Sequence, residues 1–137
     1  MKVTQLTLFL ENRSGRLAEV ADLLGKAGIN IRGFSTTEAA EYGILRLIVT
    51  DPAAARALLH EAGFTTHFSQ VLCVRVPDQP GGLAEVLDTL AAAGVSIDYL
   101  YSISFQNICF AVHDVDRAID LLRGKVTLLS DEEVRAL

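Results

Sequence analysis

The sequence predicts an α+β protein built from two copies of one small β-α-β-β-α-β unit. The first observation is a repeat: the segment from Glu11 to Ile31 recurs from Pro77 to Ile97 after a shift of 66 positions, without a gap. The second is that short runs with alternating apolar residues flank runs with helical spacing in both copies. A fixed internal period sets the architecture. We therefore expect two modules, residues 1–69 and 70–137.

The size of each copy indicates how the copies pack. A unit of under 70 residues buries only about 60% of the surface that its unfolded chain exposes, so it is marginal alone. No Gly/Ser-rich or Pro-rich linker separates the copies. We expect the modules to be joined side by side, sharing a core or a continuous sheet.

The first copy begins with a strand from Val3 to Leu10, followed by turn residues from Glu11 to Gly15. A helix follows, because apolar residues recur at i, i+3, i+4 and i+7; they are Leu17, Val20, Ala21 and Leu24. The other face is predicted to meet water and carries Arg16, Glu19, Asp22 and Lys26. Gly28 is expected to end this helix.

Strands are predicted next from Ile31 to about Thr37 and from Ile44 to Thr50, with a hairpin connection that ends in Tyr42-Gly43. Asp51 suits a helix cap and Pro52 the first helical position. This second helix carries Ala55, Leu58, Leu59 and Ala62 on its inner face and ends at Gly63. A short strand from Phe64 to Phe68 completes the module.

The second copy repeats the order. Its strands are predicted at Val71–Val76, Ile97–Ser104, Asn107–His113 and Val126–Leu129. Helices are expected after Gly81 and from Asp116 to Arg123. Ser130 and Glu133 have the spacing of a capping box, which predicts a last helical turn.

This order of elements gives an antiparallel sheet with both helices on one face, the ferredoxin-like arrangement. The helix side is assigned to Leu45, Leu47 and Val49, and to Ile108, Phe110 and Val112 in the second copy. The opposite side then carries Ile44, Arg46, Ile48, Cys109, Ala111 and His113, together with Phe9 and Cys73. Because that side is too apolar for a wet surface, we expect another subunit to cover part of it, as in a homodimer.

Composition argues against several classes of protein. The net charge is −5 with no basic cluster, which argues against a nucleic-acid partner. The first ten residues alternate polar with apolar, and the apolar runs are too short to span a bilayer, so neither a signal peptide nor a membrane segment is expected. Cys73 and Cys109 lie in apolar runs and are expected to be buried free thiols of a cytoplasmic protein. His60 and His67 have no partners at ligand spacing, so we expect no metal and no cofactor.

The repeated motif resembles the signature of ACT domains, here in tandem. The motif is a strand, then (N/D)-x-(P/S)-G-x-L-A-E-V, then A-G-(I/V)-x-I, and the match extends from Val3 to about Leu129. ACT domains are small regulatory modules that bind amino acids and related metabolites. The loop ENRSG resembles the ENRPG loop of the serine-binding regulatory domain of phosphoglycerate dehydrogenase, with Ser14 in place of the proline.

The resemblance implies a ligand held between two modules, by this loop from one and by the start of the second strand from the other. Carried over to this chain, the first set is Asn12, Arg13, Ser14, Gly15, Arg16 and Leu17 with Asn30 and Ile31. The second set is Asp78, Pro80, Gly81, Gly82 and Leu83 with Ser96 and Ile97. Physical chemistry agrees with such a loop, because the first turn of a helix offers unpaired N–H groups and partial positive charge to a carboxylate.

The two loops differ in chemistry. Arg13 and Arg16 flank the first loop and favour a carboxylate, whereas Asp78 in the second favours an ammonium group or no ligand. Tyr99 and Tyr101 are expected to fill part of the second site. The first loop is therefore ranked as the ligand site. An alternative stays open, in which Asn12 and Asp78 are helix caps and the glycines serve turn geometry alone.

The sequence thus predicts a non-catalytic regulatory protein of amino-acid metabolism that binds a small-molecule effector, an amino acid, at interfaces between ACT modules. A first alternative is a regulatory subunit that acts in trans on a metabolic enzyme without binding a ligand. A second is an acylphosphatase-like enzyme, because Arg13-Ser14-Gly15-Arg16 imitates an anion-cradling loop on the same kind of fold.

Overall fold

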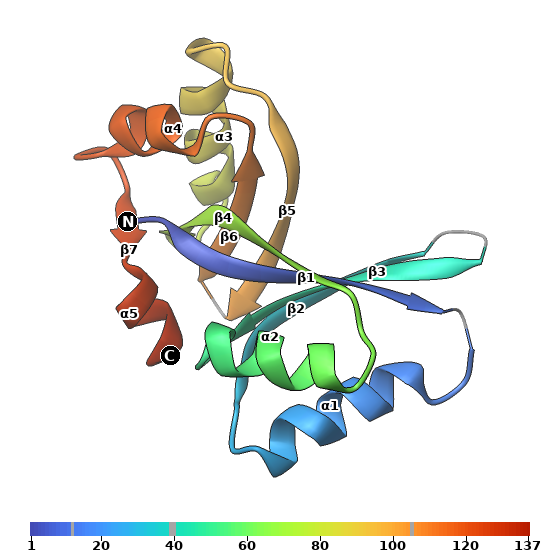
Figure 1. Ribbon diagram of the computed structural model, residues 1–137. Coiled ribbons are helices and arrows are strands. Elements are labelled where there is room, and N and C mark those ends of the chain that lie inside the picture. Colours follow the sequence, from blue (N-terminus) through green and yellow to red (C-terminus); the bar gives the residue numbers. More distant parts are fainter. Residues whose placement is uncertain (12, 39–40, 105) are drawn as a thin grey trace. The chain divides into compact units, whose positions relative to one another are not determined.

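Two units make up the chain, and each is described by itself. The computed structural model describes residues 1–11, 13–38, 41–104 and 106–137 (Figure 1). Contacts between residues divide these into a first unit, Thr4–Ser69 with Ala136, and a second unit, Gln70–Arg135 with Met1–Val3 and Leu137.

The first unit is a sheet with two helices. Its elements are β1 (Val3–Glu11), α1 (Arg16–Lys26), β2 (Ile31–Glu38), β3 (Tyr42–Val49), α2 (Pro52–Glu61) and the first part of β4 (Thr66–Arg75). The strand order is β2-β3-β1-β4. Both β1 and β2 run antiparallel to β3, with Leu8 opposite Leu45 and Phe34 opposite Leu47. This is the ferredoxin-like arrangement that the sequence predicts.

The second unit repeats the arrangement. The rest of β4 is followed by α3 (Gly82–Ala92), β5 (Ile97–Ser104), β6 (Asn107–Val112), α4 (Val115–Leu122), β7 (Thr127–Leu129) and α5 (Asp131–Arg135). Its strands lie in the order β7-β4-β6-β5, and every pair in that order is antiparallel. The topology of the two units is therefore the same, which confirms the predicted fold class.

Each unit has its own apolar core between sheet and helices. In the first unit, strand and helix residues form one buried cluster, among them Leu6, Leu8, Leu10, Leu45, Leu47, Val49, Val20, Leu24, Ala55 and Leu59. In the second, Phe110 and Val112 are buried with helix residues that include Val86, Leu90 and Leu122. The predicted helix side of both sheets is thereby confirmed. Burial of each of the larger side chains contributes about 1.5–3 kcal/mol.

Two sequence-based boundaries are wrong. The segments Phe64–Phe68 and Val71–Val76 were expected to be separate strands, but a single strand, β4, runs from Thr66 to Arg75. No glycine, proline or asparagine interrupts that stretch, so nothing turns the chain. Tyr42 and Gly43 belong to β3 rather than to a hairpin connection.

The helix-free side of the sheets also differs from expectation. Within a single chain, Ile48, Cys73 and Cys109 are at most 1% exposed and Ala111 is 7% exposed. Phe9 stays 42% exposed, and Ile44 and Arg46 are half-buried. The inference that this side needs a second subunit to cover it is therefore wrong, and a homodimer stays a prediction without that support.

Helix caps follow the sequence in α2, α4 and α5. The Asp51 carboxylate accepts from the Ala54 N–H at 3.1 Å, and the Asp114 carboxylate accepts from the Arg117 N–H at 3.0 Å. Ser130 and Glu133 form the predicted reciprocal capping box, with bonds of 3.1 and 3.2 Å. Substituting such a cap costs about 1 kcal/mol.

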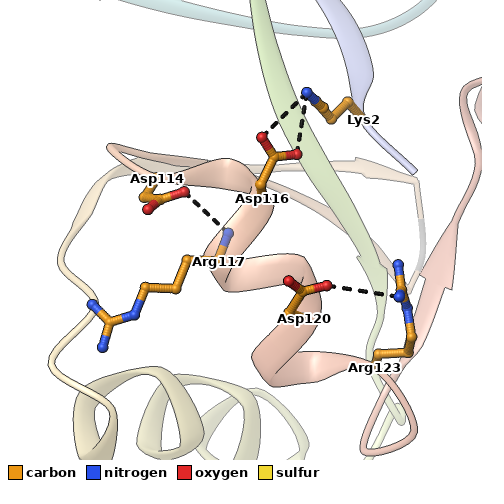
Figure 2. A network of polar contacts seen from close by, with 6 residues as sticks. All are labelled: Lys2, Asp114, Asp116, Arg117, Asp120 and Arg123. Atoms are coloured by element: carbon orange, nitrogen blue, oxygen red, sulfur yellow. Dashed lines mark hydrogen bonds and ion pairs between the residues drawn. The ribbon is translucent and has the colours of Figure 1, made fainter.

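One surface ion pair joins Lys2, near the start of the chain, to α4, and a second lies at the end of that helix. Figure 2 shows the Lys2 ammonium beside the Asp116 carboxylate, 3.1 Å away, and Arg123 beside Asp120 at 3.6 Å. All four side chains are largely exposed, so each pair contributes at most about 1 kcal/mol. None of the described helices is both long and apolar enough to cross a bilayer.

Candidate functional site

The two repeated loops end at glycines that start helices. Gly15 and Gly81 are the N-caps of α1 and α3, and both have a φ of 85°. Only glycine adopts this left-handed conformation without a cost of about 1–2 kcal/mol. Neither helix has a side-chain cap hydrogen bond, so the reading of Asp78 as a cap is wrong. Asn12 lies outside the described residues. Among the described residues no side chain caps either helix, and both helix starts carry partial positive charge.

A cavity of about 210 Å³ adjoins the first of these loops. It is lined by Leu10, Glu11, Arg13, Arg16 and Leu17, and by Thr36, Thr37, Gly43, Ile44 and Leu45 of β2 and β3. The structure thus brings three predicted residues of the loop and helix start to one cavity. Ser14 and Gly15 are exposed beside it but do not line it.

Arg16 does not point to solvent as predicted. Its side chain is 14% exposed, its Nη1 donates to Glu19 Oε2 at 2.8 Å, and its guanidinium carbon lies 4.3 Å from the centre of the Phe64 ring. An arginine stem covers apolar surface readily, and an aromatic ring attracts the cation above its face. Arg16 is therefore engaged within the chain. Arg13 is the exposed cation of this loop, because its contact with Glu11 is long at 3.7 Å and 64% of its side chain is exposed.

Asn30 and Ile31 lie at the far end of α1, about 16 Å along its axis from the loop. The Asn30 N–H donates to Thr50 Oγ1 at 3.0 Å, and its carbonyl accepts from the Thr50 N–H at 3.0 Å. Ile31 lines a different, apolar cavity of about 180 Å³, which it shares with Leu17 and Phe34. Within one unit, Asn30 and the loop do not meet in a single small site.

The second loop borders a cavity of about 380 Å³. Asp78, Pro80 and Leu83 line it, together with Val76, Pro77, Gln79, Gln106 and Ile108. Ser96 is exposed and Ile97 half-buried at the other end of α3. Tyr99 and Tyr101 stack on each other with ring centres 6.5 Å apart and do not line this cavity, so the expectation that they fill it is wrong.

Sequence reasoning missed a further hollow in the second unit. A cavity of about 320 Å³ is lined by Arg75, Pro77, Gly82, Glu85, Val86, Gly124, Lys125, Val126 and Thr127. One signal was present in the repeat: Gly82 stands at the position of Arg16. The absence of that side chain leaves room where the first unit has a filled corner.

The cysteines are poor nucleophiles. Cys73 and Cys109 face each other across β4 and β6, and both are free and fully buried. The hydrogen bond with Cys73, together with burial, raises the pKa of the Cys109 thiol far above its usual value. Among the described residues no three His, Cys, Asp or Glu side chains gather as metal ligands do. With Arg16 already paired, the acylphosphatase alternative also loses one of its two arginines.

Comparison with known proteins identifies the family. A family model described as an ACT domain pair matches residues 1–136. The chain belongs to this ACT family. Among curated proteins none matches the chain.

Solved structures agree with the ACT fold. Protein BT0572 from Bacteroides thetaiotaomicron is 39% identical with a TM-score of 0.95, over 100% of this chain and 98% of that one. The ligand-free regulatory subunit of aspartate kinase from Thermus thermophilus has 15% identity and a TM-score of 0.65, over 88% and 89%. Aspartate kinase from Synechocystis has 18% identity and a TM-score of 0.64, over 88% of this chain and 24% of that chain. The tandem ACT arrangement predicted from the repeat is confirmed.

Proposed function

We propose that this ACT protein is a non-catalytic regulator of amino-acid metabolism. It binds a small metabolite, an amino acid, beside Gly15 at the start of α1 in the first unit. The observation that carries the proposal is the N-terminus of α1 at Gly15, which no described side chain caps, next to a cavity that Arg13 lines. Free N–H groups, the helix dipole and a guanidinium all favour a carboxylate at that point.

The size and the charges of the cavity fit a small zwitterion. Its volume of about 210 Å³ lies below the roughly 300–1,000 Å³ of pockets for drug-sized ligands. Glu11 lines the same cavity as Arg13, so an ammonium group has an acceptor close to the donor for the carboxylate. The family resemblance adds the start of the second strand of another module, and the contribution of Asn30 stays a prediction.

A ligand screen tests this proposal. Each of the twenty common L-amino acids is added at millimolar concentration and the thermal midpoint is recorded, because a ligand at 100 times its Kd stabilises the folded state by about 2.7 kcal/mol. Isothermal titration of each hit then compares Arg13→Met with Arg123→Met, a matched change at the exposed arginine that follows α4. We expect Arg13→Met to weaken binding about tenfold or more. If none of the twenty raises the midpoint, the proposal is wrong.

A second candidate function is regulation of an enzyme in trans without a ligand. Phe34 is 66% exposed and Leu17 51% exposed, and both border the apolar cavity of about 180 Å³ in the first unit. Exposed apolar surface of this kind is typical of protein–protein contacts. If this candidate holds, Phe34→Asp releases a copurifying metabolic enzyme, whereas Arg13→Met does not.

Two further features belong to the proposal. We place the protein in the cytoplasm, where buried free thiols such as those of Cys73 and Cys109 are common. We also propose a homodimer, with Phe34 at its contact. Sedimentation of wild type and Phe34→Asp at micromolar concentration tests the dimer, and a wild-type monomer would exclude it.

A further inference from the structure

The cavity behind α3 is the place where the two units differ most in chemistry. Gly82, Glu85, Val86 and Val126 line it, and the repeat places the first three on Arg16, Glu19 and Val20. Val126 packs against the core of the second unit shortly after α4 and Gly124. Phe64 packs in the core of the first unit directly after α2 and Gly63. The same corner is therefore present twice.

In the first unit this corner is closed by the chain itself. The Arg16 guanidinium lies over Phe64 and binds the Glu19 carboxylate at 2.8 Å. In the second unit the counterpart of Arg16 is glycine, and a Cβ at Gly82 would collide with the carbonyl oxygen of Pro77. Any side chain at position 82 would therefore require the backbone to shift, and with glycine there the corner stays open with a volume of about 320 Å³.

Three charged side chains around the open corner have hydrogen-bonding groups that bind no other described residue. In the described part of the chain the Glu85 carboxylate and the Lys125 ammonium make no hydrogen bond or ion pair. Arg75 donates only through Nε, to Asn107 Oδ1 at 3.3 Å, and leaves both Nη groups for another acceptor. The Thr127 hydroxyl lines the same cavity. The lining therefore offers two cations, one carboxylate and one hydroxyl.

We propose that this corner of the second unit is a separate binding site for a free α-amino acid. The carboxylate of the ligand lies between Arg75 and Lys125, and its ammonium group binds the Glu85 carboxylate. In this arrangement the ligand supplies from outside the cation that Arg16 supplies to Glu19 within the first unit. The site shares Pro77 with the loop cavity that Asp78, Pro80 and Leu83 line but is otherwise lined by different residues, and it does not depend on the site proposed at Gly15.

The charges discriminate between ligand classes. A plain carboxylic acid would leave Glu85 without a partner, and a plain amine would leave two cations unmatched, whereas a zwitterion satisfies both. A bound hydrogen-bonding group that lacks its charged partner loses roughly 10- to 100-fold in affinity. Selectivity for the amino acid over its deaminated and decarboxylated analogues is the expected property of the corner.

Isothermal titration of the full chain tests the proposal. The probes are the amino acids that raise the thermal midpoint in a screen of the twenty, each with its deaminated acid and its decarboxylated amine. We expect Lys125→Met and Glu85→Gln each to weaken binding at this site about 10- to 100-fold. The controls are the matched changes Lys26→Met and Glu19→Gln in the first unit. They are expected to change the affinity of the second-unit corner by at most about twofold. The analogues are expected to bind wild type as weakly as the amino acid binds the variants.

The outcomes separate the two proposals, and loss of one binding site in Lys125→Met and of another in Arg13→Met would support both. Loss of binding in Lys125→Met, with Arg13→Met unchanged, supports this corner and excludes the site at Gly15. Unchanged binding in Lys125→Met and Glu85→Gln overturns the inference, and loss in Arg13→Met would then leave the proposed function standing. Equal affinity for the amino acid and its deaminated acid also overturns it, because Glu85 would have no role. If no amino acid binds wild type, both proposals fall.

Discussion

Arg16 is predicted to stabilise the first unit from the corner where the second unit has a glycine. The test is Arg16→Met, which keeps an apolar stem on the edge of the core and removes the guanidinium. Two contacts are lost: the ion pair with Glu19, whose side chain is 47% exposed, and the stacking on Phe64 at 4.3 Å.

The expected loss follows from these two contacts. An ion pair at i,i+3 on a helix contributes about 0.2–0.5 kcal/mol. A cation over an aromatic ring contributes about 0.5–2 kcal/mol, toward the upper end when the cation is largely desolvated, as Arg16 is. The sum is about 1–2 kcal/mol. With an unfolding entropy of about 2.1 cal/mol/K per residue, a chain of 137 residues loses about 3–4 °C in Tm per kcal/mol.

The assay is thermal unfolding followed by circular dichroism, for Arg16→Met, Phe64→Leu and the double variant. Residues in contact give a coupling energy that the sum of the single changes does not predict. We expect a drop in Tm of about 3–7 °C for Arg16→Met and a measurable coupling with Phe64. Glu19→Gln is the control, since it removes the ion pair alone. A drop of under about 1 °C for Arg16→Met, or additive changes, would refute the view that Arg16 closes this corner.

Three further predictions concern the rest of the chain. Gly82→Ala should destabilise the protein by about 1–3 kcal/mol, because a Cβ at that position would collide with the Pro77 carbonyl oxygen. Gly25→Ala should stabilise it by about 0.5–1 kcal/mol, because a Cβ there meets nothing within 4 Å in the last turn of α1; chemical denaturation of both variants measures the two changes. Asp51→Ala and Asp114→Ala should each cost about 1 kcal/mol by the same measurement, and a change of under about 0.3 kcal/mol would contradict the cap assignment. The pKa of the Cys109 thiol is raised in the folded state, so its contribution to the free energy of unfolding is complete below the ordinary thiol pKa of about 8.5 and is lost as pH rises above that value. Denaturation between pH 7 and 10 should show this fall in stability in wild type and a smaller fall in Cys109→Ala.

Local patterns in the sequence predict the frame of each unit. The spacing of Leu6, Leu8 and Leu10, and of Val20 and Leu24, records which side of each element meets the core, and the structure buries all five. Such periodicity is visible because every residue of an element obeys it. Turns that depend on one glycine were equally predictable, because only glycine adopts a φ of 85°, as at Gly15, without an energetic cost.

The chemistry of the corners was less predictable, for two physical reasons. Arg16 carries both an apolar stem and a charged end, so helical spacing cannot say whether it meets water or lies over Phe64. The hollow at Gly82 depends on a side chain that is missing, and a missing side chain leaves no periodic signal. The join between the units was also misread, because Ser69 and Gln70 continue β4 where two strands were expected.

The two corners carry the same glutamate with different neighbours. Both units keep a glutamate in the first turn of the helix, Glu19 and Glu85, and only one of them retains an arginine beside it. Glu85 is exposed, so water alone can satisfy its carboxylate, and what distinguishes this corner is the cavity that Glu85 shares with Arg75 and Lys125. The proposed amino acid would place its ammonium group next to Glu85, as the Arg16 guanidinium lies next to Glu19 in the first unit. The first corner therefore predicts the charge of the group that the second corner binds beside Glu85, which is a cation.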